Sequence, residues 1–232
     1  MFDHVDKGII LEDDDVPSQS FFPYCKELLD KYENDTRISI ISGINYAESL
    51  KDCPYSYFFT RDVAIWGWAT WKRVIDQWEP DYVFLKDKYH MGLLKDVLAQ
   101  NDLRDTIIPL MEKHGKEGKE YYETILMAYH YLNSGLTIVP AYNMINNIGL
   151  SGGTHYSTTL NELCKHDRRI FEMKRFEIEI PLKHPKYIIE NVAYNLEVNK
   201  ILDRNRPWYA KFHRRQSQIK RFVLKIKNFL NI

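Results

Sequence analysis

Four adjacent carboxylates stand near the start of the chain, at Glu12, Asp13, Asp14 and Asp15. Neighbouring carboxylates repel one another unless a cation or firm hydrogen bonds offset the repulsion. A hard cation such as Mg²⁺ or Mn²⁺ prefers carboxylate oxygens and takes water or phosphate oxygens as its other ligands. One or two of these side chains and a diphosphate would complete such a shell, with the metal neutralising charge on the leaving diphosphate. The alternative is a solvated acidic turn at the start of the next helix.

The elements around this run are predicted from apolar spacing and from Gly and Pro positions. Strands are predicted at residues 8–11, 38–43 and 136–140, with a strand or loop at 55–59. Helices are predicted at residues 19–32, 93–99, 103–111 and 120–133, and from the Trp-rich segment 64–71 to about residue 77. Polar loops are predicted at residues 113–119 and 146–157. This alternation predicts an α/β fold with a mixed, largely parallel sheet flanked by helices, in which ligands bind beyond the carboxyl ends of strands.

Four segments in order resemble those of GT-A-fold glycosyltransferases. Residues 8–22 resemble the family's metal-binding segment, in which a strand ends in Glu-Asp-Asp and a Pro-x-x-x-Phe-Phe helix start follows. Residues 66–73 resemble its GWATW segment, residues 122–123 stand where relatives carry Trp-Asp, and residues 147–155 resemble its NIG…(T/S)H loop. The chain is similar in particular to bacterial family-2-like nucleotide-diphospho-sugar transferases, and more distantly to the N-acetylglucosaminyltransferase of N-glycan branching.

The resemblance implies the following roles for the carboxylates. Asp14 would be the direct ligand of the metal, Mn²⁺ or Mg²⁺. Glu12 and Asp13 would hold the ribose and sugar of the donor or the waters of the metal. Glu123 would be the general base that deprotonates an acceptor hydroxyl, which requires a carboxylate within hydrogen-bond reach. Relatives have Asp at that position, so Glu120 is kept as the second candidate, and an ordinary exposed helix residue is the alternative for Glu123.

The same resemblance implies contacts of other residues with the donor. Gly67 would permit close approach of the backbone to the ligand. Trp68 and Trp66 would stack on sugar faces, with a core role for one of them as the alternative. His155 would contact the diphosphate or the metal, or would be a loop histidine in water. Asp15 stands where relatives carry Cys or Leu, and it is left without a role.

Taken together, the resemblance predicts a metal-dependent, inverting glycosyltransferase with a GT-A-like fold. The donor would be a nucleotide sugar, and the acceptor a glycan, a lipid-linked molecule or another hydroxyl compound in bacterial polysaccharide biosynthesis. Residues 1–200 would be the C-terminal part of the catalytic domain. Only seven residues precede Gly8, so we expect an N-terminally truncated domain or one completed by a partner, with an open sheet edge and weak or no turnover alone. The alternatives are a metal-dependent phosphohydrolase and a non-catalytic fragment.

Composition narrows the partners and the compartment. The formal net charge is zero, so a general preference for nucleic acid is not expected. Three widely spaced cysteines predict neither a disulfide framework nor structural zinc, and they fit a reducing, cytoplasmic compartment. Residues 201–232 carry no acidic side chain after Asp203 and repeat apolar residues at helical spacing. This basic amphipathic helical tail is predicted either to dock peripherally on the anionic inner face of the membrane or to pack on the domain.

Overall fold

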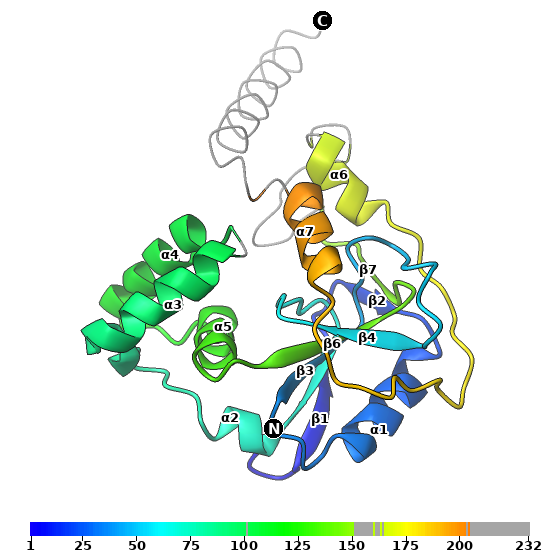
Figure 1. The fold of residues 1–232 in the computed structure, drawn as a ribbon, viewed down its shortest axis with the longest axis horizontal. Helices are drawn as coiled ribbons and strands as arrows, with labels where there is room; N and C mark the ends of the chain where they lie inside the picture. Colours follow the sequence, from blue (N-terminus) through cyan, green and yellow to red (C-terminus); the bar gives the residue numbers. More distant parts are fainter. Residues whose placement is uncertain (101, 151–159, 161–162, 164, 203, 205–232) are drawn as a thin grey trace, which may run out of the picture.

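The computed structural model describes residues 1–100, 102–150, 160, 163, 165–202 and 204, and this part of the chain has an α/β fold (Figure 1). The strands are β1 (Lys7–Ile10), β2 (Asp15–Pro17), β3 (Ile38–Ser42), β4 (Tyr57–Thr60), β5 (Trp68–Trp71), β6 (Leu136–Pro140) and β7 (Ile145–Asn147). The helices are α1 (Phe21–Lys31), α2 (Lys72–Ile75), the 3₁₀ helix η1 (Val83–Lys86), α3 (Lys88–Gln100), α4 (Arg104–Glu117), α5 (Tyr122–Leu132), α6 (Lys165–Phe171) and α7 (Val192–Ile201).

The main sheet has five strands in the order β1-β5-β3-β6-β4, and β2 pairs with β7 in a separate two-stranded sheet. Only β3 and β6 are parallel neighbours, and the other three neighbouring pairs of the main sheet are antiparallel. The sheet is therefore mixed, as predicted, but the prediction that it is largely parallel is wrong. The reason is the fully described stretch between residues 42 and 68, which forms β4 without a helix. Parallel neighbours need a long crossover, whereas antiparallel neighbours do not.

Helices cover both faces of the main sheet (Figure 1). Successive side chains of a strand point to opposite faces. Ile41 and Ala69 accordingly belong to the core cluster that includes the buried side of α1, while Ile40 and Trp68 pack against Leu126 of α5 on the other face. Helices α3 and α4 pack outside α5 through a further apolar cluster. The result is a layered arrangement in which the start of α5 reaches the same sheet edge as the acidic run.

The strands predicted at residues 8–11, 38–43 and 136–140 and the helices predicted at residues 19–32, 93–99, 103–111 and 120–133 are confirmed in position. Strands β2, β5 and β7 were not predicted, and one predicted loop is helical. Residues 113–119, predicted as a polar loop, are for the most part the last turns of α4, which ends at Glu117 and is followed by the C-cap residue Gly118 with a left-handed φ of 64°. Gly115 suggested a loop, but it is a packing residue inside the helix. A Cβ atom there would come within 3.1 Å of Leu85 and 3.2 Å of Tyr82, so the glycine lets α4 approach the η1 segment closely.

The two edges of the main sheet differ. Beside β4, Asn191 donates its backbone N–H to the carbonyl of Phe59 at 2.8 Å, which covers that edge. β1 pairs only with β5 among the described residues, so it is the edge strand of the main sheet beside the acidic run. Of the predicted tail, only residues 201, 202 and 204 are described, and its predicted helix lies outside the described residues. No helix in the described part is long and apolar enough to cross a membrane.

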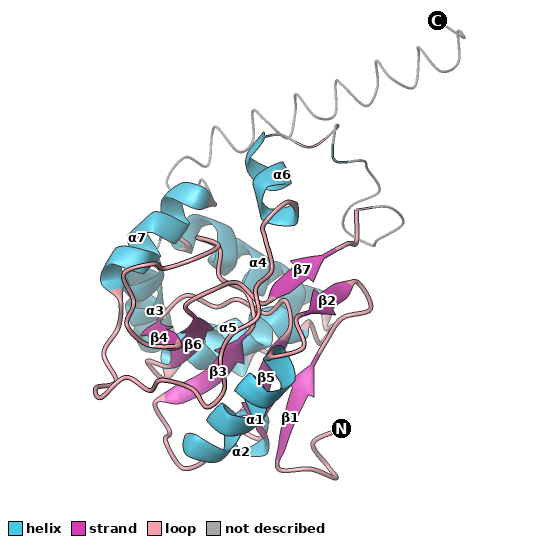
Figure 2. Ribbon diagram, turned by 90° about the vertical axis from the view of Figure 1, so that its right-hand side faces the viewer, coloured by secondary structure: helices cyan, strands magenta, loops and turns pink. Residues whose placement is uncertain are grey.

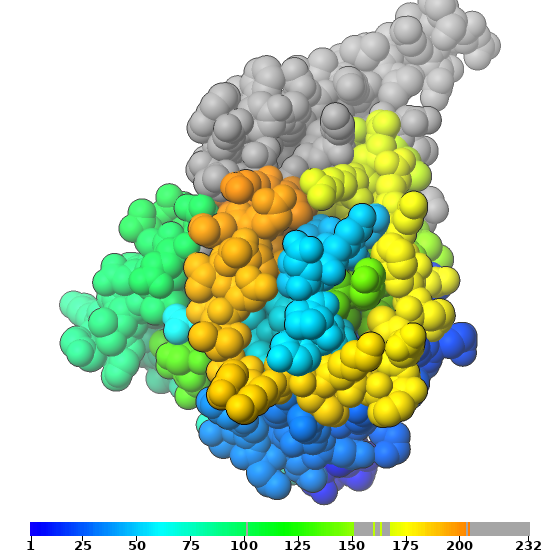
Figure 3. All heavy atoms as spheres, turned by 45° about the vertical axis from the view of Figure 1, so that its right-hand side comes forward, coloured from blue at the N-terminus to red at the C-terminus, as the bar shows by residue number. Residues whose placement is uncertain are grey.

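The segment between α6 and α7 crosses the surface beside α1 and residues 45–56 (Figure 3). It is tied to the start of α1 through Glu177, whose carboxylate accepts the backbone N–H groups of Gln19 and Ser20 at 3.0 and 2.7 Å. Ser20, the N-cap residue of α1, makes no side-chain capping bond itself. Glu177 thus gives a partner to the two backbone N–H groups that immediately precede α1, and it ties down the start of the helix that follows the acidic run.

Candidate functional site

The acidic run lies where the carboxyl ends of β1 and β3 meet the start of β5. After Ile10 the chain turns, with the backbone N–H of Asp15 donating to the carbonyl of Glu12 at 3.1 Å. It then enters β2, which pairs with β7 so that Asp15 faces Asn147. Figure 2 shows this small sheet beyond the carboxyl end of β1. The run is therefore held between the main sheet and a second, short sheet.

Asp15 ties the turn to the rest of the site. Its Oδ2 accepts the backbone N–H of Gly67 at 2.8 Å and that of Glu12 at 3.2 Å. The side-chain amide of Asn147 lies 3.4 Å from its Oδ1. Burial raises the pKa of Asp15 to about 6, against the opposing effect of these hydrogen bonds. Both oxygens of Asp15 thus have partners within the chain, and its role is to position Glu12 and Gly67.

Asp14 faces the segment that follows β7. Its Oδ1 accepts a hydrogen bond from the side-chain amide of Asn147 at 2.8 Å, and its carbonyl accepts the N–H of Ile148 at 2.9 Å. Asn147 also accepts the N–H of Gly149 at 2.9 Å. A Cβ atom at Gly149 would lie only 1.8 Å from Oδ2 of Asp14, so only a glycine leaves room for this carboxylate. Asn147 and Gly149 therefore orient Asp14.

Glu12 is joined to α5. The hydroxyl of Tyr122 donates to Oε1 of Glu12 at 2.5 Å. Burial, more than this bond, raises the pKa of Tyr122 well above its usual range, so the hydroxyl keeps its proton and is the donor. The ring of Tyr122 is stacked on that of Trp68, with centroids 6.4 Å apart and planes 4° from parallel. Trp68 thus supports Tyr122, which in turn positions Glu12.

The structure places the two candidate bases differently. Glu123 lies in the first turn of α5, half-buried and adjacent to Tyr122, and its carboxylate has no hydrogen-bond partner among the described residues. The start of a helix favours a carboxylate. Glu120 precedes the helix and is exposed. Of the two, Glu123 lies next to the residue that contacts the acidic run.

Of the four other residues predicted to contact the donor, three are described, and their surroundings differ. Trp68 is only 2% exposed, so its ring lies in the core and is not open to a sugar, whereas Trp66 is half-buried with its ring 5.4 Å from that of Phe171. Gly67 has a φ of 57°, and a Cβ atom there would lie 2.4 Å from Ile145. The close approach at Gly67 is thus made by the chain's own side chain. His155 lies outside the described residues.

The four carboxylates do not converge on one point. Within the described ranges, no three His, Cys, Asp or Glu side chains are grouped as a metal site. Glu12 is bound by Tyr122, Asp15 by Gly67, and Asp14 by Asn147, while Asp13 is exposed. Oxygens without a partner in the described chain remain on Asp13 and Asp14. That donor set fits a cation that takes one or two carboxylate oxygens and otherwise binds phosphate and water, as Mg²⁺ does.

Comparison of the chain with protein-family models finds no match, and comparison with curated proteins finds none either.

The contacts described above also involve residues to which the sequence assigned no role, namely Asp15, Tyr122 and Asn147. Each of these residues lies inside one of the four segments that resemble the GT-A family, and that resemblance is the sequence signal that could have identified them. Without the fold, the sequence does not show that the side chains of Tyr122 and Asn147 contact the acidic run, or that Asp15 joins that run to Gly67.

Proposed function

We propose that this chain is a metal-dependent glycosyltransferase that moves a sugar from a nucleotide-diphosphate donor to a hydroxyl acceptor with inversion. The observation that supports this most is a set of three hydrogen bonds. Gly67, Tyr122 and Asn147 each donate to a different carboxylate of the acidic run. They belong to the three other segments that resemble the GT-A family, so all four segments meet at one place in the fold.

Asp14 and Asp13 are the carboxylates proposed to hold the metal. Asp14 is oriented by the amide of Asn147, as outer groups orient metal ligands in other proteins. Asp13 is exposed beside it. A divalent ion bound there with the donor would neutralise the charge that develops on the departing diphosphate. Glu12, fixed by Tyr122, has one oxygen left for a hydroxyl of the donor.

Glu123 is proposed to accept the proton of the acceptor hydroxyl. The acceptor oxygen forms its bond to the anomeric carbon while the bond from that carbon to the diphosphate oxygen breaks, and the proton passes to the carboxylate. One displacement inverts the anomeric centre and needs no covalent enzyme intermediate. Because Glu123 follows Tyr122 directly, the Tyr122–Glu12 bond sets the position of the base relative to the donor carboxylates.

Titration calorimetry with UDP-sugars and GDP-sugars, with and without Mn²⁺, tests the proposal. Binding of a sugar nucleotide that strengthens when Mn²⁺ is present supports it. Binding of Mn²⁺ without any preference for a nucleotide would favour a metal-dependent phosphohydrolase or a non-catalytic fragment instead. No binding of any sugar nucleotide at millimolar concentration contradicts the proposal.

A further inference from the structure

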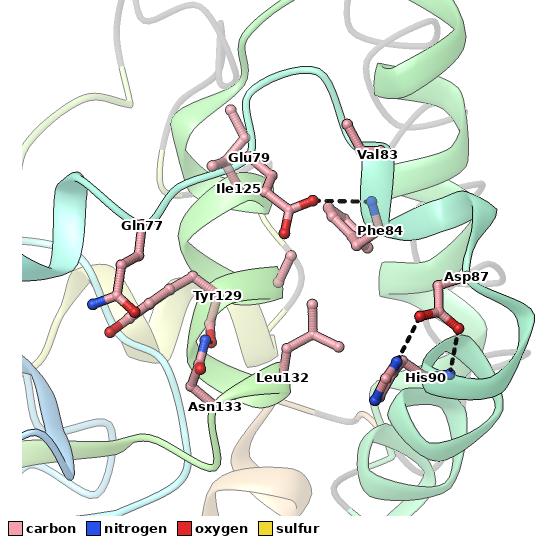
Figure 4. A pocket seen from close by; sticks show the side chains of 11 residues that line it. Gln77, Glu79, Val83, Phe84, Asp87, His90, Ile125, Tyr129, Leu132 and Asn133 are labelled. Atoms are coloured by element: carbon pink, nitrogen blue, oxygen red, sulfur yellow. Dashed lines mark hydrogen bonds and ion pairs between the residues drawn. The ribbon is translucent and has the colours of Figure 1, made fainter.

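A separate cavity lies between α5 and the stretch from residue 77 to residue 90 (Figure 4). Helix α5 and strands β2 and β7 lie on opposite sides of the main sheet in Figure 1. Its volume is about 400 Å³, enough for a small organic molecule. None of its lining residues belongs to the acidic run or contacts it. Its lining residues are Gln77, Glu79, Val83, Phe84, Asp87, His90, Ile125, Ala128, Tyr129, Leu132 and Asn133.

The floor of the cavity is apolar and otherwise well packed. Phe84 is 8% exposed and Ile125 is 2% exposed. Leu132 lies below Glu79 and to the left of Asp87 in Figure 4. Val83 at the rim is 43% exposed. A ligand with an apolar ring would therefore contact carbon atoms of these side chains. Small-molecule sites are usually lined mostly by apolar side chains.

The polar groups around this floor are mostly acceptors. Oε2 of Glu79 accepts the backbone N–H of Phe84 at 3.1 Å, and the Glu79 carboxylate projects toward the centre of the cavity (Figure 4). Its Oε1 has no partner among the described residues. The amide nitrogens of Gln77 and Asn133 already donate to backbone carbonyls, at 2.7 and 2.9 Å, which leaves their oxygens as acceptors. Asp87 is satisfied by His90 and by backbone N–H groups.

No lysine or arginine is among the lining residues, and Glu79 is exposed, so the cavity offers a solvent-accessible carboxylate oxygen without an ionic partner in the described chain, beside apolar side chains. Anions are disfavoured there, and a neutral ring leaves Glu79 without an ionic partner. From the free carboxylate oxygen, the two amide oxygens and the apolar floor, we propose that this cavity binds a small organic ammonium ion. Its nitrogen would donate to Glu79, and its apolar body would lie on Phe84, Ile125 and Leu132. This proposal does not depend on the glycosyltransferase function.

Three probes of nearly the same shape test the charge preference: benzylamine, benzyl alcohol and benzoate, each titrated at pH 7 into the full chain. Binding is followed by NMR of the methyl groups of Val83, Ile125 and Leu132, with Ile148 and Ile189 as exposed methyl-bearing residues elsewhere. We expect benzylamine to shift the three cavity residues alone and to bind about tenfold more tightly than benzyl alcohol, since hydrogen bonds to charged groups are the stronger ones. Equal binding of the three probes, or no shift at the cavity, overturns the proposal.

A pair of variants locates the charge. Glu79→Gln keeps an oxygen for the N–H of Phe84 and removes the charge, so benzylamine should bind about tenfold more weakly, close to benzyl alcohol. Asp81→Asn removes a charge from an exposed residue that does not line the cavity, and it should change affinity by less than about threefold. Unchanged binding in Glu79→Gln, or an equal loss in both variants, contradicts the proposal.

Discussion

The hydroxyl of Tyr122 donates a 2.5 Å hydrogen bond to the carboxylate of Glu12, 110 positions earlier in the chain. This bond joins the start of α5 to the acidic run at the carboxyl end of β1. It holds Tyr122, the residue directly before the proposed base Glu123, against Glu12, one of the carboxylates proposed to hold the donor. The two halves of the proposed reaction are therefore linked through one phenolic hydroxyl, and that link can be removed without altering the packing of the ring.

Tyr122→Phe should weaken Mn²⁺-dependent binding of a sugar nucleotide about five- to tenfold, because one hydrogen bond to a charged group is lost. The ring remains stacked on Trp68, so the melting temperature should change little. Tyr121→Phe is the matched control, since its hydroxyl donates to Glu117 on the surface at 3.1 Å. Calorimetry on both variants checks this, and equal affinities would show that Tyr122 does not position Glu12.

Gly149→Ala should reduce affinity for Mn²⁺ and donor by about tenfold or more, the range seen when groups around metal ligands are altered. Its new Cβ atom would lie 1.8 Å from Oδ2 of Asp14, so the carboxylate must turn away from Asn147. Gly92→Ala is the control, because a Cβ atom there meets nothing within 4 Å inside α3. That variant should bind normally and be stabilised by about 0.5–1 kcal/mol. Normal binding by Gly149→Ala would remove Asp14 from the site.

Glu123→Gln should leave binding of the donor intact and lower turnover by about a hundredfold or more, since a general base contributes at least that much. Turnover is measured by NMR of the anomeric proton with the chain in excess over the sugar nucleotide. Glu120→Gln, a change at an exposed position before the helix, should keep full turnover. The reverse pattern would transfer the role of base to Glu120.

The elements of the fold were largely predictable, whereas the contacts between them were not. The apolar runs that became β3 and β6 and the periodic segments of α1 and α5 were identified because each pattern is local. The strand directions failed because β4 and β5 follow β3 without a helix, and alternating apolar residues do not report direction. The Tyr122–Glu12 and Asn147–Asp14 bonds join residues 110 and 133 positions apart, and no spacing rule predicts them.

The buried side chain of His130 should make stability depend on pH. Because burial keeps the ring neutral at pH 7, its Nε2 donates to the carbonyl of Arg61 at 3.1 Å and its Nδ1 accepts from the hydroxyl of Ser39 at 2.6 Å. Burial lowers its pKa from 6.5 to about 4. Between those values the unfolded chain takes up a proton that the folded chain does not. Stability should therefore fall as the pH falls through this window, by about 3 kcal/mol in total.

His130→Gln isolates this effect, because glutamine can donate to Arg61 and accept from Ser39 without titrating. Urea unfolding of both proteins between pH 7 and pH 4 should show a shallower loss of stability in the variant. His4→Gln changes an exposed histidine and should follow the unaltered protein. Parallel curves for His130→Gln and the unaltered protein would mean that His130 does not titrate differently in the folded state.

The most direct test of the proposed function is calorimetric titration of a sugar nucleotide into Asp14→Ala and the unaltered chain, each with and without Mn²⁺. Asp14 is the proposed metal ligand, held by the Asn147 amide at 2.8 Å. The proposal predicts that Mn²⁺ strengthens binding to the unaltered chain and has no effect on binding to Asp14→Ala. If Mn²⁺ strengthens binding to both proteins equally, the metal and the donor do not meet at the acidic run and the proposed site is wrong.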